Sequence, residues 1–116
     1  MYDFANAQLM GRATSDAQLF NIESAEKTSK ATFTLACNIA VQRRTGKDTY
    51  TIYRRIMVLG PFANYVASCQ DQDGLQGRLC VLNGTMDNES FSNDNEVIRV
   101  SSPCGSIKIM DRRSID

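Results

Sequence analysis

Apolar and polar residues alternate along most of this sequence, and turn residues interrupt the alternation at short intervals. The clearest case is residues 31–41, where Phe33, Leu35, Cys37 and Ile39 are separated by smaller or polar residues. A period of two is typical of strands that are buried on one face, whereas a helix repeats its apolar positions every three or four residues. The pattern therefore predicts a mostly β protein.

Turn signals divide the rest of the chain into short elements. Residues 6–14 and 18–22, with Ser15 and Asp16 as a turn between them, predict a hairpin or one bent first strand. Gly46 indicates a hairpin loop at 42–48, because glycine supplies the positive φ of such turns. The other expected elements are a strand at 49–59, a helix at 61–70 beginning with Pro61, a polar link at 71–74, a strand at 79–85, a polar loop or exposed hairpin at 87–95, and short strands at 97–100 and 107–110.

The expected helix lies between the third and fourth main strands. This order is that of a five-stranded oligonucleotide-binding (OB) fold barrel. A β-sandwich would not need a helix at that point, and a βαβ fold would need more helices. Because 116 residues suffice to bury one sizeable core, we expect a single OB-fold domain over residues 1–116.

The strand at 49–59 is expected to have two unlike faces. If Ile52, Ile56 and Val58 point into the barrel, Tyr53 and Arg55 point outward. Strict alternation would also send Arg54 inward. A bulge, a strand end or an interface would resolve that conflict.

The chain contains no histidine, which removes the commonest general base and the commonest metal ligand. The four cysteines lie far apart with no C-x-x-C pair, so we expect no metal site and no cofactor. Cys37 and Cys80 stand in apolar runs and are expected to be buried as small hydrophobes. An enzyme would need paired carboxylates or a cysteine nucleophile without histidine.

No window reaches the roughly 18 to 20 apolar residues of a membrane span, and the first residues lack the layout of a signal peptide. We therefore expect a cytoplasmic protein with no membrane contact.

Charge is balanced overall but uneven along the chain. The 13 basic and 13 acidic residues give a formal net charge of zero, which argues against binding through a general positive field. Residues 43–55, however, contain five cations and one carboxylate, Asp48. The residues expected to neutralise phosphates are Arg43, Arg44, Lys47, Arg54 and Arg55, with Arg12 and Lys30 extending the track. The alternative is that these charges are merely solvated.

Three aromatic residues are candidates for stacking against bases. Tyr53 is expected on an outward strand face beside Arg55, Phe91 stands alone in a polar segment, and Tyr50 opens its strand. The alternatives are that Tyr53 packs under a loop or at a subunit contact, that Phe91 contacts a partner protein, and that Tyr50 caps the barrel.

The chain resembles the bacterial and phage single-stranded DNA-binding proteins of the OB fold. The resemblance rests on four motifs. They are residues 31–36 (ATFTLA), residues 53–60 (YRRIMVLG), the apolar helix positions Phe62 and Val66, and the spacing from Gly77 to Asn83 and Gly84. It implies that Tyr53 and Phe91 occupy the positions of DNA-stacking tryptophans, that Arg55 is the strand arginine, and that the protein is a homotetramer or dimer.

This sequence departs from that family in its aromatic residues and at its C-terminal end. It has no tryptophan, and Val41 and Leu59 stand where the family generally has aromatics, which predicts weaker binding per site. We expect residues 111–116 to be a short end without the acidic tail through which the family recruits partners. Such a compact version looks more like a phage protein than a host protein.

Two functions of different classes fit the sequence. The first is non-catalytic, sequence-independent binding and protection of single-stranded DNA in replication, recombination and repair. The second is a protein-interaction OB module, an adaptor of a primosome or recombination complex, in which Phe91 would contact a protein.

Overall fold

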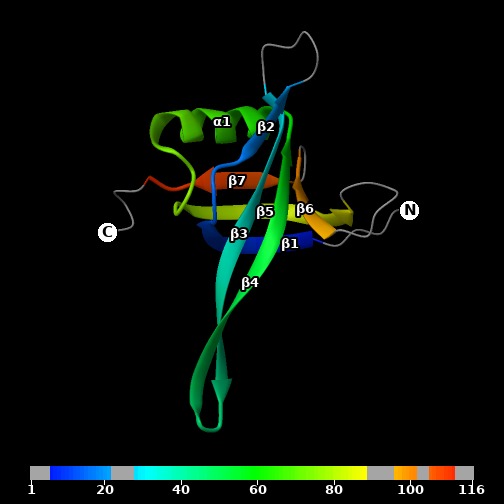
Figure 1. Ribbon diagram of the computed structural model, residues 1–116. Coiled ribbons are helices and arrows are strands. Elements are labelled where there is room, and N and C mark those ends of the chain that lie inside the picture. Colours follow the sequence, from blue (N-terminus) through cyan, green and yellow to red (C-terminus); the bar gives the residue numbers. More distant parts are fainter. Residues whose placement is uncertain (1–5, 22–27, 89–95, 102–104, 112–116) are drawn as a thin grey trace, which may run out of the picture.

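The computed structural model describes residues 6–21, 28–88, 96–101 and 105–111. Strands dominate this part of the chain, with one helix among them (Figure 1). In chain order the elements are β1 (Asn6–Ala13), β2 (Gln18–Asn21), β3 (Thr28–Arg43), β4 (Gly46–Leu59), α1 (Pro61–Asp73), β5 (Leu79–Asn88), β6 (Glu96–Val100) and β7 (Ser106–Ile109).

Five of the strands close into a barrel in the order β1-β3-β4-β6-β5. The pairing of β1 with β5, from Asn6 opposite Thr85 to Arg12 opposite Leu79, closes the ring. All these pairs are antiparallel except β4 with β6. Helix α1 lies between β4 and β5, the third and fourth main strands of the chain. The predicted five-stranded OB-fold barrel is confirmed.

The first two strands are one bent strand rather than a hairpin. Both pair antiparallel with β3, β1 through Ala13 opposite Leu35 and β2 through Gln18 opposite Thr32. The chain bends between them and continues along the same neighbour. The bent-strand alternative of the sequence prediction is therefore correct.

The ladder between β3 and β4 is longer than predicted. It runs from Lys30 opposite Leu59 to Arg43 opposite Gly46, so the chain reverses over Arg44 and Thr45 alone. The expected loop at 42–48 is thus wrong, because the backbone hydrogen bonds of the ladder continue through a polar sequence and Gly46, at φ 132°, absorbs the reversal.

Past the pairing with β1 and β6 this ladder continues as a two-stranded ribbon, which we call the arm and define as residues 37–55. Its first residue, Cys37, still packs in the core. The last pair of β3 with β1 is at Ala36, and the first pair of β4 with β6 is at Ile56. In Figure 1 the arm extends well away from the barrel.

Helix α1 begins where predicted and ends later. Gly60, at φ 66°, precedes Pro61 at the first helical positions. The helix continues to Asp73 and stops at Gly74, whose φ is 71° and whose backbone N–H donates to the carbonyl of Gln70 at 2.7 Å. The predicted polar link at 71–74 is wrong, because no residue before Gly74 breaks the helix.

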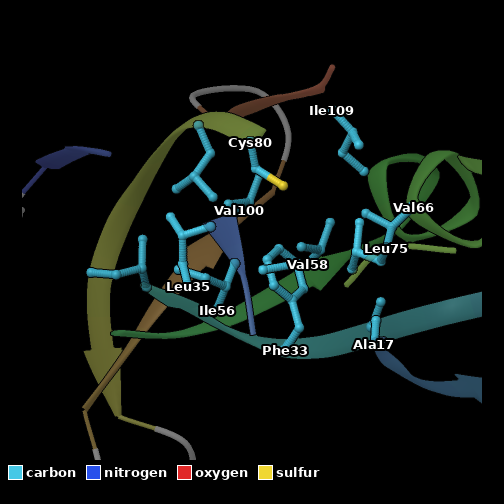
Figure 2. Close-up of a cluster of buried hydrophobic side chains, with 14 of the residues drawn as sticks. Ala17, Phe33, Leu35, Ile56, Val58, Val66, Leu75, Cys80, Val100 and Ile109 are labelled. Carbon is cyan, nitrogen blue, oxygen red and sulfur yellow. The ribbon is translucent and has the colours of Figure 1, made fainter. Parts of the chain in front are cut away.

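The core fills the barrel and reaches the helix. Figure 2 shows Leu35, Ile56 and Val58 of the barrel strands in one cluster with Val66 of α1 and with Leu75, which follows the end of α1. The strands alternate about a buried face, as the period of two predicted.

The two cysteines expected in the core are indeed buried. Cys37 lies on β3 and Cys80 on β5. Burial raises the pKa of the Cys80 thiol to about 11 and also raises the pKa of Cys37, so both remain protonated near neutral pH.

Two glycines on the strands that close the barrel, β1 and β5, allow these strands to approach their other neighbours, β3 and β6, closely. A Cβ at Gly11 of β1 would overlap the carbonyl oxygen of Ala36 and lie 2.9 Å from Sγ of Cys37. A Cβ at Gly84 of β5 would lie 2.6 Å from Cγ2 of Ile98 and 2.7 Å from the carbonyl oxygen of Arg99. Neither contact can be relieved by rotating a flexible side chain alone, because backbone carbonyls take part in both.

We predict that Gly11→Ala and Gly84→Ala each lower the free energy of unfolding by about 1 to 3 kcal/mol, the usual range for overpacking. Urea unfolding followed by circular dichroism measures this change. Thr49→Ala, at an exposed position of the arm, is the control and should stay within about 0.5 kcal/mol of the wild type. Wild-type stability in both glycine variants would contradict the account of barrel closure.

Candidate nucleic-acid interface

The register of the ladders sorts side chains onto two faces, because directly opposed residues of antiparallel strands point the same way. One face of β3 and β4 contains the core residues Phe33 and Ile56, which are paired with each other. We call the opposite side the outer face. Its positions are Arg12 of β1, Gln18 and Phe20 of β2, Lys30, Thr32, Thr34, Ala36, Asn38 and Ala40 of β3, and Lys47, Thr49, Thr51, Tyr53, Arg55, Met57 and Leu59 of β4.

Tyr53 is the most prominent aromatic residue of the outer face. Its side chain is 61% exposed, so the predicted outward orientation is confirmed. Tyr53 is opposite Ala36, which is opposite Arg12 on β1, and the three residues form one row across three strands. With strands about 4.8 Å apart, the ring and the Arg12 side chain start roughly 10 Å from each other. The residue between them, Ala36, has a small side chain.

The next row of the outer face consists of two polar side chains. Thr51 is opposite Asn38, and its hydroxyl donates to Oδ1 of Asn38 at 2.7 Å. Ala40 and Thr49 form the row after that. Tyr53 therefore has small or short polar side chains beside it in its own row and in the next two rows of the outer face.

Cations and carboxylates are unevenly distributed between the faces. The outer-face positions defined above include Arg12, Lys30, Lys47 and Arg55 and no aspartate or glutamate. Asp48, the carboxylate nearest in sequence, is opposite Val41 and so belongs to the inner side of the arm. A chain of zero formal net charge thus has a cationic face.

The four cations are spread along the face. Arg55 is half-buried in the row of Thr34, directly beside the row of Tyr53. Nη1 of Arg12 donates to the carbonyl of Gly77 at 3.1 Å, which holds the guanidinium near the barrel. Lys47 is exposed near the end of the arm, six residues from Tyr53, which corresponds to about 20 Å of strand.

Two predicted residues lie on the other side of the arm. Tyr50, 50% exposed, is opposite Ile39, and Arg54 is opposite Leu35. The alternation that predicted an inward Arg54 is correct, and no bulge interrupts the ladder. Arg54 is nevertheless exposed, because the arm leaves the barrel there, and its Nη1 donates to the carbonyl of Tyr53 at 3.0 Å. Tyr50 and Arg54 are therefore not grouped with Tyr53.

Three further predicted residues are not part of this grouping. Arg44 is exposed in the turn of the arm. Phe91 and the side chain of Arg43 lie outside the described residues.

Sequence reasoning missed Phe20. This ring is 39% exposed on β2, and Nζ of Lys30 lies 5.0 Å from its centroid. Its neighbour Leu19 is opposite Ala31, a core residue, so alternation sends Phe20 to the outer face. An inward Leu19 was the signal that would have identified it.

Within the described residues, no group of three or more histidine, cysteine or acidic side chains is arranged to hold a metal ion. The same residues include no helix with the length and apolar character that crossing a membrane requires.

The fold of this chain is similar to that of several solved structures. The chain superposes on a Plasmodium falciparum SSB in complex with ssDNA with a TM-score of 0.72 and 20% identity, covering 96% of this chain and 98% of that one. The chain has the fold of a single-stranded DNA-binding protein. Neither the protein-family models nor the curated protein sequences give a match.

Two bacterial structures show the same likeness. The small single-stranded DNA-binding protein from Streptomyces coelicolor has a TM-score of 0.63 at 10% identity, over 97% of this chain and 99% of that one. A deletion mutant of the single-stranded DNA-binding protein from Thermus aquaticus has a TM-score of 0.69 at 16% identity, over 94% of this chain and 51% of that one. At these identities the shared feature is the backbone fold.

Proposed function

We propose that this protein binds single-stranded DNA through the outer face, without sequence preference and without chemistry on the strand. The observation that supports this most directly is the sorting of charge. An exposed tyrosine lies beside small side chains on a face whose positions include four cations and no carboxylate. The fold shared with a Plasmodium falciparum SSB in complex with ssDNA supports the same ligand.

Stacking of bases and neutralisation of phosphates would both contribute to the binding free energy. A base stacked on Tyr53 contributes about 1 to 3 kcal/mol whatever its identity, since every base has a π-face. Arg55, two residues from Tyr53 along β4, and Arg12, two strands across from it, would neutralise the adjoining phosphates, with Lys30 and Lys47 further along the face. Arg44, in the turn of the arm, would join them at its far end, whereas Tyr50 and Arg54, on the opposite side of the arm, would contribute little.

The role that follows is protection of single-stranded DNA in replication, recombination and repair, in the cytoplasm. With one exposed tyrosine described beside the cations, each copy would bind modestly. Several copies on one strand would bind far more tightly, because linked sites raise each other's effective concentration.

We propose that copies of the chain associate through β1. Residues 6–11 of β1 pair with β5 along one edge, and among the described residues no strand pairs with the other edge. This stretch contains no charge and no proline, the usual protections of an open edge, and Met10 on it is 63% exposed. A second copy could add its own β1 in the isologous manner of a two-fold dimer.

We expect light scattering to report a dimer or tetramer. The double variant Gln8→Lys with Met10→Lys should lower the assembly state, since lysines on an edge oppose strand pairing. The control is Thr49→Lys on the arm, which should leave it unchanged. A monomeric wild type at micromolar concentration would contradict the association.

Tyr53→Ala should weaken binding of a labelled dT oligomer about 5- to 150-fold, whereas Tyr50→Ala should change it little, because the two rings point to opposite faces. Fluorescence anisotropy at several salt concentrations measures both. If the four cations each neutralise one phosphate, the plot of log K against log salt should have a slope of about −3.

Equal losses in the two tyrosine variants would show that the outer face is not the binding surface. Absence of binding at low salt would overturn the proposed function and favour a protein-interaction adaptor.

A further inference from the structure

Phe20 and Lys30 form a pair at the end of the outer face that is opposite the arm. They are direct cross-strand partners of β2 and β3, and Nζ of Lys30 lies 5.0 Å from the Phe20 ring centroid. The ring is 39% exposed and is not part of the hydrophobic core cluster. A large aromatic side chain is thus held partly exposed at the surface beside a cation.

The pair lies on the same face as Tyr53. Lys30 and Ala36 are separated by an even number of residues on β3, so their side chains project to the same side. Ala36 is the direct partner of Tyr53. Six residues of strand separate the two rows, which corresponds to about 20 Å. Thr32 and Met57, which form a row between them, are buried, so a strand of DNA that contacts both rings would pass over that row.

Four hydrogen bonds fix the bend that leads into β2. The backbone N–H of Ala17 donates to Oε1 of Gln70 at 2.7 Å, and Nε2 of Gln70 donates back to the carbonyl of Ala17 at 3.1 Å. Oδ1 of Asp16 accepts from the backbone N–H groups of Leu75 at 2.8 Å and Gln76 at 3.1 Å. The residues that lead into β2, the four-residue strand that contains Phe20, are thereby anchored to α1 and to the residues that follow it.

We propose that Phe20 and Lys30 form a second nucleotide subsite, in which a base stacks on Phe20 and the Lys30 ammonium neutralises the adjoining phosphate. The inference rests on the proposed function, because it adds a site for the same DNA strand. A ring and a cation in contact match the two parts of a nucleotide, a flat base and an anionic phosphate.

The test uses dT oligomers of increasing length, from about 4 to about 16 nucleotides, the range of site sizes per OB fold. Tyr53→Ala should weaken binding at every length. Phe20→Ala should leave the shortest oligomers unaffected and weaken the longer ones about 5- to 20-fold, at the lower end of the usual stacking contribution.

Leu19→Ala is the matched control. Leu19 adjoins Phe20 on β2 and is equally exposed, at 40%, but it is opposite Ala31 on the inner side. Loss of a general contribution of β2 to folding would affect both variants, whereas loss of a stacking subsite affects Phe20→Ala alone.

A second variant tests the subsite without removing the ring. The chain has no tryptophan, so Phe20→Trp introduces a single fluorescent reporter. A base that stacks on this tryptophan quenches its fluorescence. Quenching by long but not short dT oligomers, with no quenching in Leu19→Trp, is the expected result. The inference is overturned if Phe20→Ala matches the wild type at every length while Tyr53→Ala does not. If the wild type binds no oligomer, the proposed function itself fails.

Discussion

The hydrogen-bonded ladder between β3 and β4 runs without interruption from Lys30 opposite Leu59 to Arg43 opposite Gly46, and it determines the orientation of most residues that matter here. Because its register does not shift, each strand position has a fixed side from the barrel to the arm. The inner side supplies Phe33 and Ile56 to the core. On the outer side Thr32 and Met57 are buried and Tyr53 is exposed, and a slip of one residue would exchange the inner and outer sets.

The same ladder explains how a neutral chain can have a cationic surface. Lys30, Lys47 and Arg55 of these two strands fall on outer positions, while Asp48 falls on the inner side of the arm together with Arg54. Net charge describes attraction at long range, which salt screens beyond about 10 Å. The local arrangement governs contact with phosphates. The proposed binding is therefore a property of one face rather than of the whole molecule.

Local patterns predicted most of the fold. Alternation identified the strands and the outward Tyr53, and the glycine and proline at Gly60 and Pro61 identified the start of α1, because these signals act on adjacent residues. The arm was predicted too short, since ladder hydrogen bonds depend on a partner strand and not on the polarity of residues 42–48. Helix α1 was also predicted too short, since its end depends on Gly74 rather than on the polar residues before it.

The candidate site was predicted less completely. Alternation could separate Tyr53 from Tyr50, but it could not place Arg12 in the row of Tyr53, because that row is made by pairing between β1, β3 and β4. Phe20 was missed for the same reason: its contact with Lys30 depends on the bend before β2 and on the side chains of Asp16 and Gln70 that anchor it. Such contacts join residues that are distant in sequence.

The most direct test of the central claim is a methyl NMR titration of the wild-type protein with a dT oligomer, since it changes no residue. Ala36 and Thr51 surround Tyr53 on the outer face, whereas Ile39 and Ile52 lie on the inner side of the same ribbon. The account predicts that the methyl signals of Ala36 and Thr51 shift as DNA is added and that those of Ile39 and Ile52 stay in place. Shifts of the two isoleucines without shifts of Ala36 and Thr51 would contradict it.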